Sequence, residues 1–262
     1  MSKPTGHNSP KSSRLLRQLG DFGVLKNQPA ENQFGARLGR LIDLSDSISL
    51  ADTLRQLSKA ASSGQVPPAQ KQGEKLKAEF LELRSAMVAF IVGSFSRRGA
   101  ANDDDSSLTS FILPDCTDEI FADDGFKPYQ RFYALHQSEM EHQITGFLAA
   151  AKTQISAASP KLERVVILDS ALFDTLQGYC RKQLAQVSSL LNRRFEALRA
   201  AAIEEAGDEL TAESLEQWLA PAGWLSRFYR EMQNLLLAEL DLRLQPLLGL
   251  IEACEYEELN QQ

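Results

Sequence analysis

Apolar residues recur every three or four positions from Ser159 to about Ala206. This spacing places them on one face of an α-helix of about 45 residues. The stripe includes the polar residues Asp169, Gln183 and Arg194, and its apolar members are Leu162, Val165, Val166, Leu172, Leu176, Tyr179, Val187, Leu191 and Leu198. A helix this long cannot bury its stripe alone, so we expect partner helices from this chain or from another copy.

Similar periodicity predicts three more long helices, and no alternating apolar run is long enough for a β-strand. The four bundle helices are expected at 69–97, 127–157, 160–206 and 222–252. Ser159 and Pro160 are typical of a helix N-cap and first position, and Pro246 should kink or divide the last helix. The pattern therefore predicts an all-α fold, an elongated antiparallel bundle of coiled-coil type with a smaller N-terminal helical segment.

Gly, Pro and Ser clusters indicate the boundaries between segments. We expect a disordered tail at 1–13, the N-terminal helical segment at 14–61, the long-helix bundle at 69–253 with an irregular loop at 99–126, and an acidic tail at 254–262. Serines should break the N-terminal segment near Asp46–Ser49 because they compete for backbone hydrogen bonds. The apolar run 86–92 is far shorter than the roughly 20 residues that span a bilayer, and we expect it to be buried on all sides.

Composition is ordinary for a soluble globular protein, with 43% hydrophobic and 24% charged residues. The net charge of −7 argues against nucleic acid as a partner, because phosphate binding needs a concentrated basic face. The polar N-terminus lacks an apolar signal core, and the 3 cysteines show no paired spacing. We therefore expect a cytoplasmic protein with reduced thiols, in which Cys180 is a buried structural cysteine.

His136, Glu139 and His142 are the strongest metal candidates, because Glu139 and His142 have the spacing used in di-iron helical bundles. A complete site of that kind needs a second such pair, and the chain has only 3 histidines. We therefore expect these residues to lie on a solvated helix face. The sequence contains no phosphate-binding loop, dinucleotide turn or nucleophile elbow. No catalytic, cofactor-binding or metal-binding residue is predicted, and no cofactor is expected.

Charged residues within the long helices are candidates for partner binding or for fixing helix register. They are Asp169, Arg193, Arg194, Glu239, Asp241 and Arg243. Glu239 and Arg243 are four residues apart, in the favourable order for an ion pair within a helix. Alternatively, Asp241 and Arg243 could pair with charged residues of the long helix across the bundle. Buried pairs of this kind can fix register, so a structural role is the leading interpretation.

Several segments together carry a family resemblance, namely residues 37–50, 126–133 with Gln137 and Met140, 159–162, 191–198 and 236–246. They resemble a family of uncharacterised, mainly proteobacterial proteins, the domain of unknown function family DUF3348. The family brings no established activity or active-site residues. Its genes are described near those for membrane proteins with peptidoglycan-binding domains and for ion-motor-like subunits. The resemblance thus implies a cytosolic accessory of a cell-envelope complex.

The leading functional hypothesis is a non-enzymatic interaction or assembly protein that binds itself or a subunit of an envelope complex through a helical face. The alternative is an adaptor or regulator at the inner-membrane surface, where the basic, amphipathic residues 11–26 would lie on anionic lipid. An enzyme with an unrecognised helical active site ranks third. Nucleic-acid binding ranks last because the charge has the wrong sign.

Overall fold

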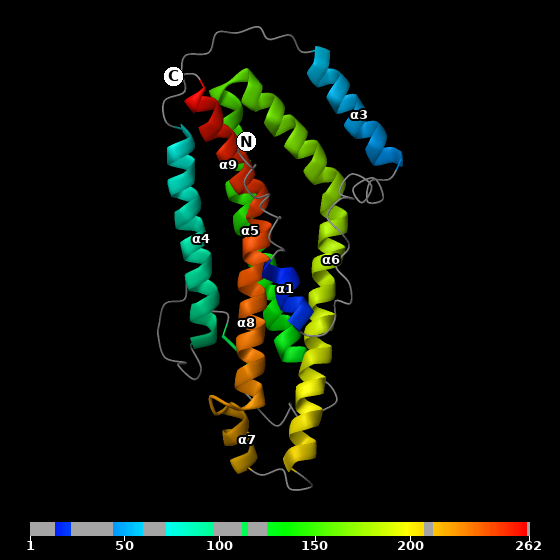
Figure 1. Ribbon diagram of the computed structural model, residues 1–262, viewed down its shortest axis with the longest axis vertical. Coiled ribbons are helices and arrows are strands. Elements are labelled where there is room, and N and C mark those ends of the chain that lie inside the picture. Colours follow the sequence, from blue (N-terminus) through cyan, green and yellow to red (C-terminus); the bar gives the residue numbers. More distant parts are fainter. Residues whose placement is uncertain are drawn as a thin grey trace, which may run out of the picture.

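The computed structural model is all-α and elongated (Figure 1). It describes residues 14–21, 44–59, 72–96, 112–114, 125–206 and 212–260, and these contain no β-strand. The helices are α1 (Arg14–Asp21), α3 (Leu44–Lys59), α4 (Gln72–Ser96), α5 (Lys127–Ala158), α6 (Pro160–Ala206), α7 (Ala212–Leu219), α8 (Trp224–Arg243) and α9 (Gln245–Leu259). The expected all-α class is therefore confirmed.

The bundle is built from α4, α5, α6 and the column formed by α8 and α9, which follow one another along the long axis (Figure 1). The column contacts all three of the other helices, and α5 also contacts α4 and α6. Because the connection between α5 and α6 is Ser159 alone, these two helices form a tight antiparallel hairpin. The hydrophobic core lies between α4, α5, α6 and the column.

Aromatic side chains fill the core at one end of the bundle. Tyr129 of α5, Phe195 of α6 and Phe228 of α8 are buried, with ring centroids 5.2 to 5.6 Å apart. Two of the three pairs have steep, edge-to-face geometry, which the ring quadrupoles favour. Trp218 of α7 extends the cluster by packing edge-on against Trp224 at the start of α8. These contacts attach the short helix α7 to the bundle.

The helix boundaries of α6, α8 and α9 follow from local chemistry. The Ser159 hydroxyl accepts a hydrogen bond from the backbone N–H of Leu162 at 3.2 Å, which caps α6 as the sequence predicted. Pro246 lies in the first turn of α9, and the column is divided at Leu244. The expected division of the last helix by Pro246 is therefore confirmed.

Three local expectations are corrected. The run 86–92 is not buried on all sides, because its apolar residues go round α4 and Val92 is 41% exposed. Residues 46–49 are helical within α3, since the serines lie in its first turns. The first backbone N–H groups of a helix have no partner within it, so serine side chains there compete with few hydrogen bonds. Residues 254–259 do not form a tail but are the last turns of α9, in which Cys254 is buried.

Two other expected segments fall largely or wholly outside the described residues. The N-terminal tail at 1–13 lies outside them, as does most of the loop at 99–126. From that loop, Leu113 is buried and its N–H donates to the carbonyl of Ser94 at 3.2 Å, next to the end of α4. α1 packs on α8, with its residues Leu15 and Leu19 buried.

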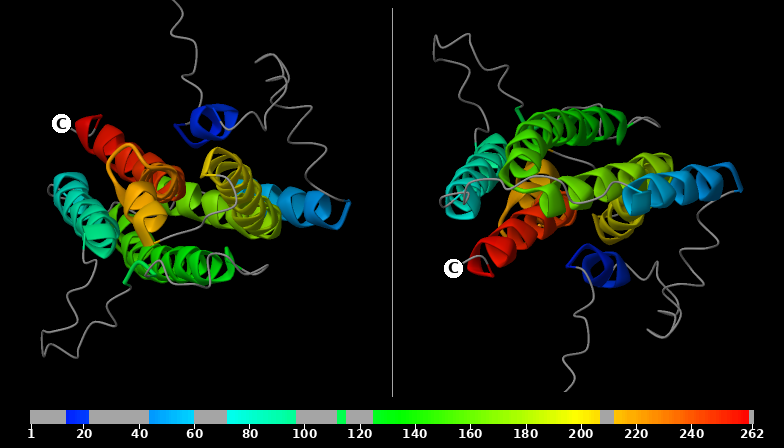
Figure 2. Two further views of the ribbon diagram at one scale, coloured as in Figure 1. Left: turned by 90° about the horizontal axis from the view of Figure 1, so that it is seen from below. Right: turned by 90° about the horizontal axis from the view of Figure 1, so that it is seen from above.

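The first half of α6 runs obliquely away from the bundle, and α3 lies along its outer side (Figure 1). Views along the long axis place α3 at the periphery, on the opposite side of α6 from α4 (Figure 2). Buried residues of α6 occur up to Val166 and again from Val187, but none lies at 167–186. The stripe read from the sequence is therefore core at both ends of α6 and only partly covered in its middle.

Candidate functional site

A buried carboxylate is the focus of the largest polar cluster among the described residues. Glu239 of α8 is fully buried and accepts hydrogen bonds from the Tyr133 hydroxyl at 2.8 Å and from Gln137 Nε2 at 3.0 Å, both on α5. Arg243, one turn further along α8, donates from Nε to Glu239 Oε1 at 2.9 Å. The carboxylate thus has donors from two helices, as a buried anion requires.

The cluster continues from Glu239 to the surface. Arg243 Nη1 lies 3.9 Å from Glu141 Oε2, and Arg181 of α6 donates from Nη2 to Glu141 Oε1 at 2.6 Å. Charges therefore alternate along a chain of side chains from the core to solvent. Gln137 Nε2 also approaches the carbonyl of Leu184 at 3.4 Å, so the cluster connects α5, α6 and α8.

Electrostatics keep Tyr133 protonated. Burial raises the pKa of the Tyr133 hydroxyl well above its ordinary value, and the adjacent Glu239 carboxylate raises it further. A phenol in this position donates a hydrogen bond and does not act as a base. The arrangement holds three helices in one register and offers no open position for a substrate, which favours a structural role.

His136 is not on a solvated helix face, contrary to the sequence-based expectation. It is fully buried, because α4 covers this side of α5, and its Nε2 lies 2.8 Å from the Ser94 hydroxyl. Its Nδ1 lies 2.9 Å from the carbonyl of Phe132, which can only accept, so Nδ1 carries a hydrogen. Burial lowers the pKa of the ring, which favours the neutral form. The Ser94 hydrogen then has two acceptors, His136 Nε2 and the carbonyl of Ile91.

The other metal candidates do not join His136. Glu139 bonds to Gln143 on the same helix at 2.7 Å, and His142 is exposed. Within the described ranges, no three His, Cys, Asp or Glu side chains gather as a metal site would require. The surroundings of His136 are aromatic, with the Phe132 ring 4.3 Å and the Phe90 ring 5.2 Å from its own.

The charged candidates are dispersed, and only Glu239 and Arg243 belong to one cluster. Asp169 pairs with Lys152 of α5 at 2.8 Å, and Arg194 pairs with Glu231 of α8 at 2.7 Å. Arg193 is exposed. The alternative pairing of Asp241 or Arg243 with these charged residues of α6 is therefore wrong. Asp169 and Arg194 have nearer partners of their own.

Asp241 lies at a junction of three helices. It accepts hydrogen bonds from Arg84 of α4 at 3.0 Å and from Arg14 of α1 at 3.3 Å. Both arginines are well exposed, so each pair contributes less than about 1 kcal/mol to stability. Their effect is to orient α1 and α4 against α8.

The cysteines differ from expectation. Cys180 is exposed, because it lies in the middle of α6, where the bundle covers the helix only in part. Cys254 is the buried one, and burial together with the nearby Glu258 carboxylate raises the pKa of its thiol to about 11. Cys116 lies outside the described residues. Neither described cysteine is placed beside a histidine that could activate it.

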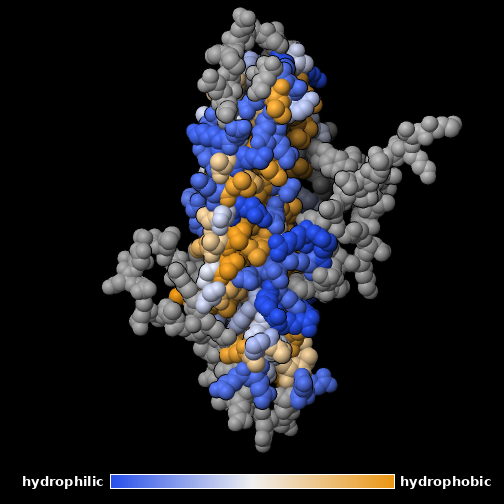
Figure 3. Space-filling model, turned by 60° about the vertical axis from the view of Figure 1, so that its left-hand side comes forward, coloured by the Kyte–Doolittle hydropathy of each residue, from blue (hydrophilic) through white to orange (hydrophobic). Residues whose placement is uncertain are grey.

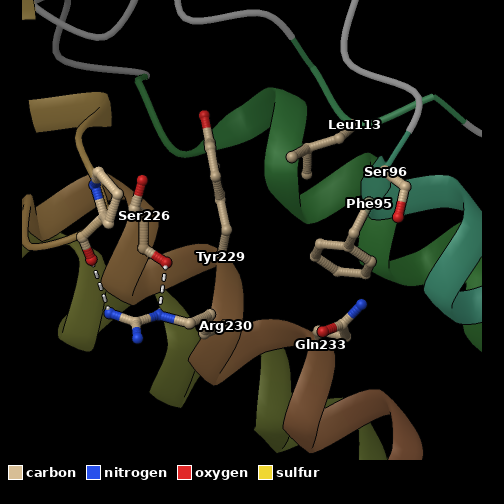
Figure 4. A pocket seen from close by; sticks show the side chains of 8 residues that line it. Phe95, Ser96, Leu113, Ser226, Tyr229, Arg230 and Gln233 are labelled. Carbon is tan, nitrogen blue, oxygen red and sulfur yellow. Dashed lines mark hydrogen bonds between the residues drawn. The ribbon is translucent and has the colours of Figure 1, made fainter. Parts of the chain in front are cut away.

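A shallow pocket of about 370 Å³ opens between the end of α4 and the first turns of α8 (Figure 4). Arg230 lies on its rim and donates from Nη2 to the carbonyl of Pro221 at 3.2 Å and from Nε to that of Ser226 at 3.3 Å. The Tyr229 hydroxyl is 2.9 Å from that of Tyr129. The lining contains no carboxylate, histidine or cysteine, so this pocket has no pair of groups suited to acid–base or nucleophilic catalysis.

The chain matches the family model described as "protein of unknown function (DUF3348)" over residues 1–256. It belongs to this family. No curated protein and no solved structure matches it. The resemblance read from the sequence is thus confirmed. Membership of DUF3348 assigns no activity, so function has to be argued from the geometry of this chain.

Sequence reasoning missed the partners of Glu239. Tyr133, Gln137 and Glu141 are spaced by four, so they share one face of α5, and this polar row was the available signal. It could not be matched to α8 without knowing which helix faces which. In the described part of this DUF3348 chain, no helix combines the length and the apolar content needed to span a bilayer.

Proposed function

We propose that this protein is a non-enzymatic helical interaction or assembly protein, an accessory of a cell-envelope complex. Its binding surface is the arm, which we define as α3 together with residues 167–186 of α6. The observation that carries the proposal is burial, because no arm residue for which burial is described is buried. Every other long helix of the bundle has buried residues throughout its length.

The arm is nevertheless rich in large apolar residues. Those of α6 are Ile167, Leu168, Leu172, Phe173, Leu176, Tyr179 and Leu184. Ile167 and Tyr179 are exposed, and α3 adds the exposed residues Ile48 and Leu54. Residues 167–186 of α6 also contact α5, through Asp169 and Arg181, yet Ile167 and Tyr179 stay exposed. Exposed apolar surface of this kind is typical of a binding site for another helix.

The alternative, an adaptor that lies on the membrane through residues 11–26, is less well supported. Leu15 and Leu19 are two of the apolar residues with which α1 would enter lipid, and both are buried against the bundle. Arg14, one of the basic residues that would contact lipid headgroups, is paired with Asp241. In the arm, by contrast, the apolar residues Ile48, Leu54, Ile167 and Tyr179 are exposed. The envelope as the site of action rests on the gene neighbourhood described for the family.

The test is affinity capture from the native host's solubilised membrane and soluble fractions. Tyr179→Asp places a charge on the arm at an exposed position, so the fold should persist while partner capture is lost. Tyr256→Asp on α9 is the matched control, since Tyr256 is also exposed and should leave capture unchanged. Proteins retained equally by both variants, or by neither variant nor the original chain, would contradict an arm-dependent binding function.

A further inference from the structure

The pocket between α4 and α8 has a polar end and an apolar end. The Arg230 guanidinium and Ser226 lie on one side of the Tyr229 side chain (Figure 4). Phe95 and Leu113 lie on the other side. Leu113 and Tyr229 are buried, so packing of the core holds these parts of the lining in place. A ligand that matches the pocket therefore has a polar group at one end and an apolar body at the other.

Arg230 is a cation that is already held in position at the polar end. Its hydrogen bonds to the carbonyls of Pro221 and Ser226 fix the guanidinium, so little freedom is lost when it binds a further group. The other guanidinium hydrogens, on Nη1 and Nη2, have no acceptor among the residues that the structure describes. A planar guanidinium held in this way suits the two oxygens of a carboxylate.

The positive charge of Arg230 is not neutralised by the described part of the chain. No described carboxylate pairs with it, and none lines the pocket. Glu231, the next residue of α8, is engaged instead by Arg194 and Arg227. Hydrogen bonds to carbonyl oxygens satisfy N–H groups but leave the net charge in place. The pocket therefore favours an anion over a neutral molecule or a cation.

We propose that this pocket binds a small organic anion, a carboxylate on a short apolar or aromatic body. The carboxylate pairs with Arg230, and the body lies against Tyr229 and Phe95. The volume of about 370 Å³ is near the lower end of the range for small-molecule sites, which suits one ring with a short chain. The pocket lies on the bundle, outside the arm, so this site goes beyond the proposed function.

A ligand-observed NMR titration of the full-length chain at low ionic strength tests the site, with 3-phenylpropionate as the probe. The probe should bind saturably in the millimolar range, because it is small and the pocket is shallow. Its neutral analogue 3-phenylpropanamide lacks the charge, and acetate lacks the ring. Each should bind at least about tenfold more weakly than 3-phenylpropionate.

Substitutions locate the binding site. Arg230→Gln should weaken the binding of 3-phenylpropionate about tenfold and leave that of 3-phenylpropanamide unchanged. Arg193→Gln on α6 is the matched control, because both arginines are exposed and Arg193 does not line the pocket. Ser96→Trp places a bulky side chain at an exposed position of the lining and should weaken the binding of both probes. Circular dichroism checks that each variant is folded.

The C-terminal residue of a peptide presents the same chemistry as a free organic acid. A short peptide that ends in phenylalanine, compared with 3-phenylpropionate and with the same peptide amidated at its C-terminus, distinguishes the two sources. Tighter binding of the free peptide than of both identifies a peptide C-terminus, and tighter binding of 3-phenylpropionate identifies a free acid.

Four results would overturn the assignment of the pocket as an anion site. They are no saturable binding, equal affinity for 3-phenylpropionate and its amide, equal losses in Arg230→Gln and Arg193→Gln, or acetate binding as tightly as 3-phenylpropionate. The last result would indicate an exposed cation only. Tyr179→Asp on the arm should leave probe binding unchanged, so partner capture and anion binding can fail separately.

Discussion

At the scale of single residues, burial rather than residue type separates the charged groups that hold the helices of the bundle together from those that face solvent. Glu239 and Asp241 are two positions apart on α8 and have the same charge. Glu239 points into the core, where donors from α5 and α8 surround it, whereas Asp241 meets exposed arginines. The two carboxylates should therefore respond very differently to removal.

Replacing Glu239 by alanine is expected to lower the free energy of unfolding by about 3–5 kcal/mol, because it leaves the largely buried Arg243 guanidinium without its nearest anion. Urea unfolding followed by circular dichroism measures the loss. Glu252→Ala, at an exposed position on α9, should change stability by less than about 0.5 kcal/mol. Equal effects of the two substitutions would show that the buried cluster does not hold the helices together.

His136 should make stability depend on pH. Burial lowers its pKa in the folded state from the ordinary value of 6.5, so below that pH the unfolded chain binds more protons than the folded one. The contribution is fully present above pH 6.5 and is lost as the pH falls towards the folded-state pKa, by at most about 1.4 kcal/mol per pH unit.

Unfolding measured between neutral and mildly acidic pH checks this dependence. His136→Gln removes the titrating group and should flatten the decline, whereas His142→Gln, at an exposed position of the same helix, should leave it as it is. If the original chain and His136→Gln lose stability in parallel, other groups cause the decline.

At the scale of elements, helix ends are set by a few local contacts. Gly223 is the N-cap of α8 and closes the turn from α7, and its N–H donates to the carbonyl of Ala220 at 2.8 Å. A Cβ atom at this position would lie 2.2 Å from the carbonyl oxygen of Trp218. Since the obstacle is backbone, it cannot move aside as a flexible side chain would. The tight turn between α7 and α8 therefore requires glycine.

Gly223→Ala should destabilise the chain, by about 1–3 kcal/mol, a cost similar to that of overpacking a core. Gly249→Ala is the matched control, because a Cβ there meets nothing within 4 Å and alanine is the better helix former. The control should gain about 0.5–1 kcal/mol. Thermal unfolding of both variants is the measurement, and a neutral Gly223→Ala would contradict the close approach.

At the scale of the whole molecule, a well-packed bundle carries an arm that it covers only in part. Figure 3, which brings α4 forward, shows an apolar stripe along the long axis between hydrophilic residues. Exposed apolar residues thus also occur on the bundle, for example Leu81, but there they lie on a helix that has its own buried face. Of the residues that the structure describes, only those of the arm form a long stretch with none buried, which is why we place partner binding there.

The sequence by itself determined the class and the limits of most helices. The periodic apolar stripe, the Ser159–Pro160 start and the Pro246 break predicted α6 and the division between α8 and α9, because these signals act within a few residues of chain. It also predicted the ion pair of Glu239 with Arg243, which lies within one helix turn.

Only the tertiary structure decided which faces of those helices are core. His136 and Cys180 were both assigned to the wrong environment, since periodicity locates a face but not the neighbour that covers it. The partners of Glu239 on α5 lie more than 100 positions away along the chain, at a distance set by packing. For the same physical reason, the stripe of α6 looks continuous in the sequence, although the bundle buries only its two ends and covers its middle in part.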